Sequence, residues 1–219
     1  SNETVLNDLR QAHAAFEEAA GNRSRVEWRS NIELPLPFLV AQAAAAALVV
    51  VGRKTEPGTM LFSVDPGDLV MRLGQPVLVV PPEVDHLDAK RVAVGWKDTR
   101  EARRAVWDAL PFLKRASQVV VISVDDGDGA ADPQDIVGLL QVHDVYATSV
   151  RKDACGSAAS EALVDAASEQ AADLLVAPAA GDAAVALADA SERVPFGTVA
   201  RIPRRALRKA DRLASFYAV

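Results

Sequence analysis

The chain has 219 residues, of which 50% are hydrophobic and 25% charged, proportions typical of a soluble globular protein with one large or two ordinary domains. Its formal net charge of -6 argues against nucleic-acid binding, because neutralising backbone phosphates requires concentrated Lys and Arg. The single cysteine, Cys155, excludes an internal disulfide framework and suits a reducing compartment. The polar N-terminus lacks the order of a signal peptide, and the interrupted apolar run Leu36–Val51 is too short to span a bilayer. We therefore expect a cytoplasmic protein without membrane contact.

Residues 1–80 alternate between helical and extended patterns. Helices are predicted at Thr4–Ala20, in the later part of Leu36–Ala47 and at Pro66–Leu73, and strands at Arg25–Trp28, Leu48–Gly52 and Pro76–Val80. The stretch from Pro81 to Asp88 holds two prolines and three acids, which cannot continue a sheet. We interpret it as a linker.

The alternation is clearer from Arg91 onward. Buried strands are predicted at Arg91–Trp96 and Gln118–Val124. Further strands are predicted near Val145–Val150, at Asp173–Pro178 and, to close the sheet, at about Ser215–Ala218. The helices between them begin at Asp98, which we expect to cap its helix with Glu101 three residues later, at Asp132-Pro133, at Ser157 and near Gly197. Five strands alternating with four helices predict an α/β fold with a parallel, doubly wound sheet.

One βα pattern occurs twice, and the later copy is the longer. The stretches Arg91–Ala116, Gly156–Val176 and Asp65–Pro82, together with their order along the chain, resemble a tandem universal stress protein, that is, two such domains in one chain. The resemblance implies two tandem copies of a Rossmann-like sheet in strand order 3-2-1-4-5. It also implies that the last strands pair, either between the two domains as a pseudo-dimer or between chains as a homodimer.

The first copy lacks its opening strands. We expect an incomplete domain at residues 1–82, a linker at residues 83–90 and a complete domain at residues 91–219. In order 3-2-1-4-5 the missing strands would be central, which leaves unpaired backbone groups in a core. We therefore expect either that the natural protein begins earlier or that a partner strand fills the space.

Many members of the family bind ATP through spaced glycines and an acidic residue after the first strand. Here Pro178 stands at the first glycine position, fifteen residues separate Gly181 from Gly197, and Lys97 stands where the acid would lie. The first copy has Asp68 in place of the hydroxyl residue, so we expect no site there. In the second copy the resemblance implies a degenerate site for ATP or another adenine nucleotide, whose candidate residues are Trp96, Lys97, Asp98, Thr99, Gly181, Gly197 and Thr198.

Two of these residues have alternative roles. Lys97 either neutralises an anion at the carboxyl edge of the sheet or is a solvated lysine beside a helix start. Trp96 either stacks on a base or packs against the helix that follows it. The three histidines, His13, His86 and His143, show no ligand-like spacing, and we predict no metal site.

No assembled catalytic set is recognisable in the chain. We therefore expect a non-catalytic stress-response protein that acts by association. The alternative is an enzyme or sensor that binds another small anionic molecule above Trp96–Thr99 and Gly181. A third hypothesis is a nucleic-acid or lipid contact by the basic segment Arg201–Arg212, which the overall acidity disfavours.

Overall fold

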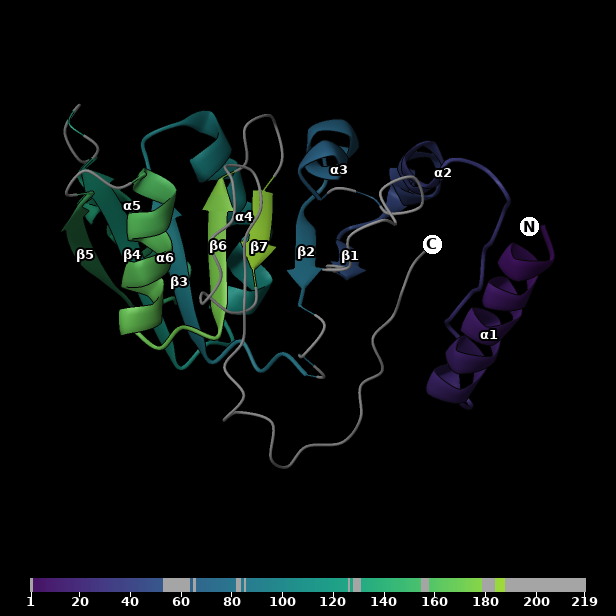
Figure 1. The fold of residues 1–219 in the computed structure, drawn as a ribbon. Helices are drawn as coiled ribbons and strands as arrows, with labels where there is room; N and C mark the ends of the chain where they lie inside the picture. Colours follow the sequence, from purple (N-terminus) through teal and green to yellow (C-terminus); the bar gives the residue numbers. More distant parts are fainter. Residues whose placement is uncertain are drawn as a thin grey trace.

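The computed structural model describes residues 2–52, 64, 66–81, 84, 86–125, 127, 131–154, 158–178 and 184–187. Its centre is a seven-stranded sheet in the order β1-β2-β7-β6-β3-β4-β5. Helices cover the sheet, and α6 lies in front of the strands in the view of Figure 1. The fold is thus α/β, as predicted.

Four parallel strands form the half of the sheet that contains residues 91–178. They are β3 (Arg91–Trp96), β4 (Gln118–Asp125), β5 (Ala147–Asp153) and β6 (Leu174–Pro178). β3 lies in the interior, where Val92 pairs with Val119 of β4 and Leu174 of β6. Five of its six residues are buried, because helices cover both faces of a parallel sheet and leave little room for polar side chains. The prediction of these four strands is confirmed, with β5 displaced by two residues at its start.

The strand next to β6 differs from the expectation. β7 (Ala184–Leu187) is antiparallel to β6, with Ala186 opposite Val176, and parallel to β2. The sequence did not predict it, because a segment of four residues, two of them alanine, is too short for a recognisable period. The predicted closing strand Ser215–Ala218 lies outside the described residues, as does the helix predicted near Gly197. β7 occupies the fifth position that the strand order 3-2-1-4-5 assigns to a parallel strand.

The two strands before residue 81 join the same sheet through β7. β1 (Val49–Gly52) pairs in parallel with β2 (Val77–Val80), and β2 pairs with β7. Their helices are α2 (Pro35–Gln42), a 3-10 turn η1 (Ala43–Ala45) and α3 (Pro66–Leu73). Both strands and α3 were predicted, and α3 has the predicted bounds. The helix predicted in the later part of Leu36–Ala47 lies instead in its earlier part, as α2, and η1 follows it.

The predicted strand Arg25–Trp28 is wrong, because this segment has no regular structure. β1 pairs only with β2 among the described strands, and none of them pairs with this segment. Side chains hold it instead. Trp28 contacts His13 and Phe16 of α1 (Asn2–Ala20), with ring centroids 5.1 and 5.5 Å away.

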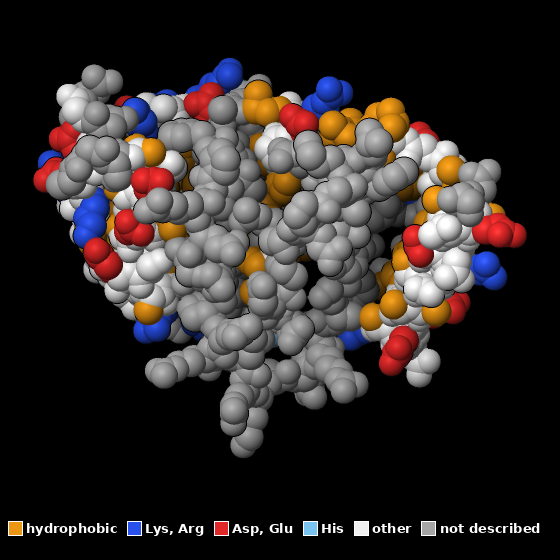
Figure 2. Space-filling model, viewed as in Figure 1, with side chains coloured by type: hydrophobic (Ala, Val, Ile, Leu, Met, Phe, Trp, Pro, Cys, Tyr) orange, Lys and Arg blue, Asp and Glu red, His pale blue; other side chains and the backbone are white. Residues whose placement is uncertain are grey.

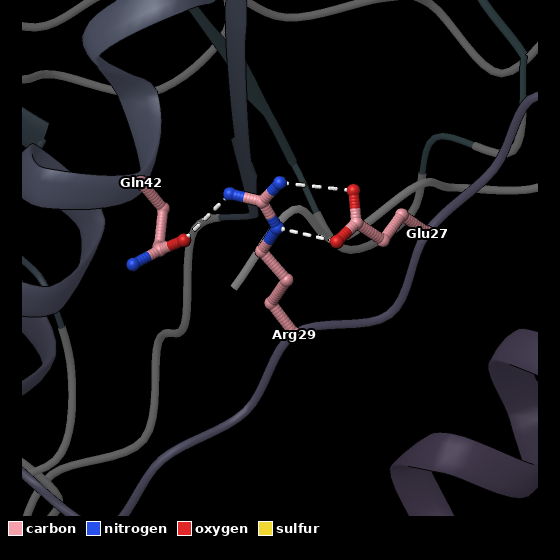
Figure 3. Close-up of polar contacts among 3 residues, drawn as sticks. All are labelled: Glu27, Arg29 and Gln42. Atoms are coloured by element: carbon pink, nitrogen blue, oxygen red, sulfur yellow. Dashed lines mark hydrogen bonds and ion pairs between the residues drawn. The ribbon is translucent and has the colours of Figure 1, made fainter.

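Arg29 ties the same segment to α2. Its guanidinium donates to both carboxylate oxygens of Glu27 at 2.9 Å and to Oε1 of Gln42 at 2.8 Å (Figure 3). The planar fork of Arg matches a carboxylate in this two-bond geometry. This bonding holds the pKa of Glu27 below its usual value. Because these contacts are exposed to solvent, they add little to the free energy of folding. Their main effect is to position the segment beside α2.

Two core clusters lie among the elements. One contains buried residues of α4 (Arg100–Leu113) and α5 (Gln134–Val142) together with strand residues such as Val92 and Val121. The other joins α6 (Ala159–Glu169) with α2 and α3 and contains the alternate strand residues, such as Ala93 and Val120. Successive strand residues point to opposite faces, so α4 and α5 cover one face and α6 the other. Figure 2 shows hydrophobic side chains reaching the surface at the top of the view, in the region of α2 and α3.

None of the helices in the described part of the chain is long and apolar enough to cross a membrane.

Candidate functional site

The carboxyl end of β3 is the position where this topology favours a ligand. β4 lies on one side of β3 and β6 on the other, so the connections after β3 and β6 diverge there. Doubly wound sheets bind ligands in the crevice at such a switch point. The residues that follow β3 are Lys97, Asp98 and Thr99, and α4 begins at Arg100.

Thr99 caps α4. Its backbone is extended, its hydroxyl accepts a hydrogen bond of 3.2 Å from the amide of Ala102, and its own amide donates to the carbonyl of Lys97 at 2.7 Å. The predicted cap, Asp98, is therefore wrong by one residue. The carboxylate of Asp98 is bonded instead to the guanidinium of Arg103, one turn into the helix. Both residues fit the N-cap preference, and the sequence alone could not decide between them.

The charges at the start of α4 are paired with one another. Besides the Asp98–Arg103 pair, Nε of Arg100 donates to Oε1 of Glu101 at 2.8 Å. This bond, with smaller contributions from the backbone amide of Glu101 and the side chain of Thr99, holds the pKa of Glu101 below its usual range. A phosphate approaching this helix start would meet the carboxylates of Asp98 and Glu101 beside the two arginines. The four side chains of these two pairs therefore carry no net charge.

Trp96 is the last residue of β3 and is buried, with 8% of its surface exposed. It belongs to the core cluster that contains Ala102, Ala105 and Val106 of α4. Its ring packs with the helix that follows it, which is the second of the two roles considered above. The buried Nε1 atom has no hydrogen-bond partner among the described residues, and such an orphaned donor is uncommon in a folded protein.

Lys97 is exposed and directly follows β3. The remaining candidates, Gly181, Gly197 and Thr198, lie outside the described residues. The structure therefore brings together Trp96, Lys97, Asp98 and Thr99 at one end of β3. Their role in nucleotide binding stays a prediction.

Sequence reasoning missed a buried carboxylate at the opposite end of β3. Oδ2 of Asp173 accepts from the amide of Lys90 at 2.9 Å, and Oδ1 accepts from the amide of Arg91 at 3.0 Å. Burial raises the pKa of Asp173, and the two amide bonds oppose that rise. The signal was an aspartate at the first position of a strand expected beside Arg91–Trp96, but strand order alone does not show which backbone amides a side chain meets.

Ser123 near the carboxyl end of β4 was also missed. It is fully buried, and its hydroxyl donates to the carbonyl of Ala131 at 2.7 Å. The bond fixes the chain where it returns from the loop after β4. Within the described residues no group of three His, Cys, Asp or Glu side chains could hold a metal ion.

Comparison with known proteins gives a structural likeness. No protein-family model matches the chain, and no curated protein matches its sequence significantly. A universal stress protein from Archaeoglobus fulgidus DSM 4304 matches with a TM-score of 0.56 and 18% sequence identity, over 78% of this chain and 62% of that one. The chain thus spans less than two thirds of the length of that protein. The likeness shows that the chain has the α/β, Rossmann-like fold of a universal stress protein.

Proposed function

We propose that the chain is a universal-stress-protein-like protein of the stress response, built from two tandem copies and acting by association rather than catalysis. The observation that carries the proposal is the strand order β5-β4-β3-β6, which corresponds to positions 3-2-1-4 of the universal-stress order. The copies are residues 1–82 and 91–219, with the linker at 83–90. A cytoplasmic location belongs to the same proposal.

Pairing of the two copies within one chain is part of this proposal. It is supported by the parallel pairing of β2, the last strand of the earlier copy, with β7 of the later copy. Sedimentation equilibrium should then give the mass of one chain. A stable homodimer would favour the alternative, in which the last strands pair between chains.

The crevice after β3 is proposed to be a degenerate nucleotide site. The support is the pairing of Asp98 with Arg103 and of Arg100 with Glu101, which leaves no concentrated positive charge at the start of α4. Calorimetry with ATP, ADP and AMP, with and without Mg²⁺, should show weak binding or none. Tight, magnesium-dependent binding of ATP would overturn this part of the proposal.

A second candidate function is the binding of another small anionic molecule at the same crevice. Two observations favour it: the exposed Lys97 at the carboxyl end of β3 and the orphaned Nε1 donor of Trp96. Native mass spectrometry of gently purified protein distinguishes the candidates. A stoichiometric ligand that disappears in Lys97→Ala, but remains in the surface control Arg10→Ala, would support the second one.

A further inference from the structure

Helix α1 carries an apolar face that the described chain covers only in part. Its apolar residues recur at intervals of four and three, which places them on one face of the helix: Val5, Leu9, Ala12, Phe16 and Ala19. Trp28 lies against Phe16, toward the end of this face. Neither core cluster of the described residues contains a side chain of α1, and in Figure 1 the helix lies beyond the β1 edge of the sheet. A helix of this length depends on packing of its apolar face, so we expect a partner on the uncovered part.

Acidic side chains border the uncovered part of this face. Val5 and Leu6 are 36% and 46% exposed. Asp8 and Glu3 are each three residues from one of them, and residues three apart are neighbours on a helix surface. The whole helix has four acids and one arginine, a formal net charge of -3. Figure 2 shows acidic side chains beside hydrophobic ones on the part of the surface that α1 forms, at the right of the view.

A segment with the opposite charge occurs later in the same chain. Residues 201–212 lie outside the described residues and hold six cations and one acid, a formal net charge of +5. After Pro203 the apolar residues recur in a helical pattern: Ala206, Leu207, Ala210, Leu213 and Ala214. The cations occupy the positions between them: Arg204, Arg205, Arg208, Lys209 and Arg212. This pattern is typical of a basic amphipathic helix, with one apolar face and a charge that complements α1.

Charge selects among the possible partners of α1. A second α1 helix, packed face to face with the first, would bring two net charges of -3 together. An anionic membrane surface or a nucleic acid would be repelled by the same acids. A basic amphipathic segment satisfies both the apolar face and its acidic border.

The segment in the same chain is within reach of α1. Thirteen residues separate Leu187, the last described residue, from Arg201, and a connection of this length spans up to about 45 Å. That span is more than twice the radius of gyration of about 17 Å expected for a compact chain of this length. Tethering of this kind gives a segment an effective concentration of order millimolar, which favours it over a segment of another protein.

We propose that residues 203–214 pack as a helix on the exposed apolar face of α1 in the same chain. Their cations face the acids of α1, and their apolar side chains cover Val5, Leu6 and Leu9. The contact compensates the positive charge of the segment, which is then withheld from nucleic acids and anionic lipids. This inference concerns neither the crevice after β3 nor the pairing of the two copies.

Zero-length cross-linking of the full chain tests the contact. A carbodiimide joins an amine to a carboxylate that lies against it, and Lys209 is the only lysine after Lys152. We expect mass spectrometry to find Lys209 joined to an acid of α1, with a yield that falls as salt rises. The ion pair of Lys152 with Glu169, 2.6 Å long, provides an internal standard. Mixing ¹⁴N- and ¹⁵N-labelled protein separates links within one chain from links between chains, and only the former are expected.

Full-length variants assign the cross-link to charge and to the apolar face. The triple variant Arg204→Glu, Arg205→Glu, Arg208→Glu should lower its yield about tenfold relative to the standard, as expected for the loss of several exposed ion pairs. The double variant Val5→Gln, Leu6→Gln should lower it as well. The matched control is Met71→Gln, which changes an exposed side chain of α3 and should have no effect. Circular dichroism checks that each variant is folded.

A charge exchange gives the most specific result. Adding Glu3→Lys, Asp8→Lys and Glu17→Lys to the triple variant should restore cross-linking with the polarity reversed, from the new lysines of α1 to the new glutamates of the segment. Links of Lys209 to carboxylates outside α1, links only between chains, or a yield unchanged in the triple variant would each overturn the proposal. The nucleotide titrations report on the crevice after β3, so either proposal can fail without the other.

Discussion

Asp173 and Arg91 hold each other by two hydrogen bonds at the start of β3. The amide of Asp173 donates to the carbonyl of Arg91 at 2.8 Å, and the amide of Arg91 donates to Oδ1 of Asp173 at 3.0 Å. The second carboxylate oxygen, Oδ2, accepts a hydrogen bond from the backbone amide of Lys90. One side chain therefore fixes the chain where it enters the central strand.

Removing this carboxylate should destabilise the fold. Asp173→Ala leaves the amides of Lys90 and Arg91 without their acceptors, which costs about 2–3 kcal/mol of unfolding free energy. Urea denaturation measures the loss, and Asp165→Ala, an exposed aspartate on α6, is the matched control. Equal midpoints for the two variants would contradict the role of Asp173.

The same carboxylate gives a pH dependence with a definite sign. Burial raises the pKa of Asp173 in the folded state above the value of 3.8 for an unperturbed aspartate, so between the two pKa values the folded state binds more protons than the unfolded state. Its contribution to stability is then fully present below the unfolded pKa and is lost as pH rises through the folded pKa. The difference in unfolding free energy between the wild type and Asp173→Asn should therefore become smaller as the pH rises through the folded-state pKa. A difference that grows with pH would show that the amide bonds outweigh burial.

Thr99, rather than Asp98, should carry the cap of α4. Thr99→Ala removes the acceptor for the amide of Ala102 and should lower the unfolding free energy by about 1 kcal/mol. Asp98→Ala removes only an exposed ion pair and should have a smaller effect. Thermal unfolding of the two variants tests which residue caps the helix. A larger loss of stability in Asp98→Ala than in Thr99→Ala would assign the cap to Asp98.

Gly95 in β3 allows α6 to approach the sheet closely. A Cβ atom at this position would lie 2.6 Å from Cδ2 of Leu163. Gly95→Val should therefore destabilise the fold by about 1–3 kcal/mol through overpacking. Leu163→Ala should cost less in the Gly95→Val background than in the wild type, which a double-mutant cycle measures. Additive effects would argue against this contact.

Local patterns in the sequence were sufficient for the parallel strands and for several helices. Runs such as Arg91–Trp96 are buried on both faces, and Pro66–Leu73 combines a proline at its first position with apolar residues at helical spacing. Both elements have the predicted bounds. Patterns of this kind depend on neighbours in the sequence, so a single sequence reveals them.

Features that depend on distant parts of the chain were not predicted. Arg25–Trp28 has the composition of a strand but no described strand pairs with it, and β7 is four residues long and lies between β2 and β6, which are distant from each other in the sequence. The role of Asp173 likewise depends on the neighbouring β3. Of the candidate site, the sequence placed Trp96–Thr99 at the carboxyl end of β3 but could not reveal that Asp98 pairs with Arg103.

The position of β7 has a consequence for synthesis of the chain. Val77 of β2 pairs with Val185 of β7, about a hundred residues later. During translation β1 and β2 emerge early, yet the backbone groups on the β7 side of β2 have no strand to bond until Leu187 has left the ribosome. An exposed, valine-rich strand edge is prone to aggregation until its partner strand pairs with it. Slowing translation between these segments should therefore lower the yield of folded protein.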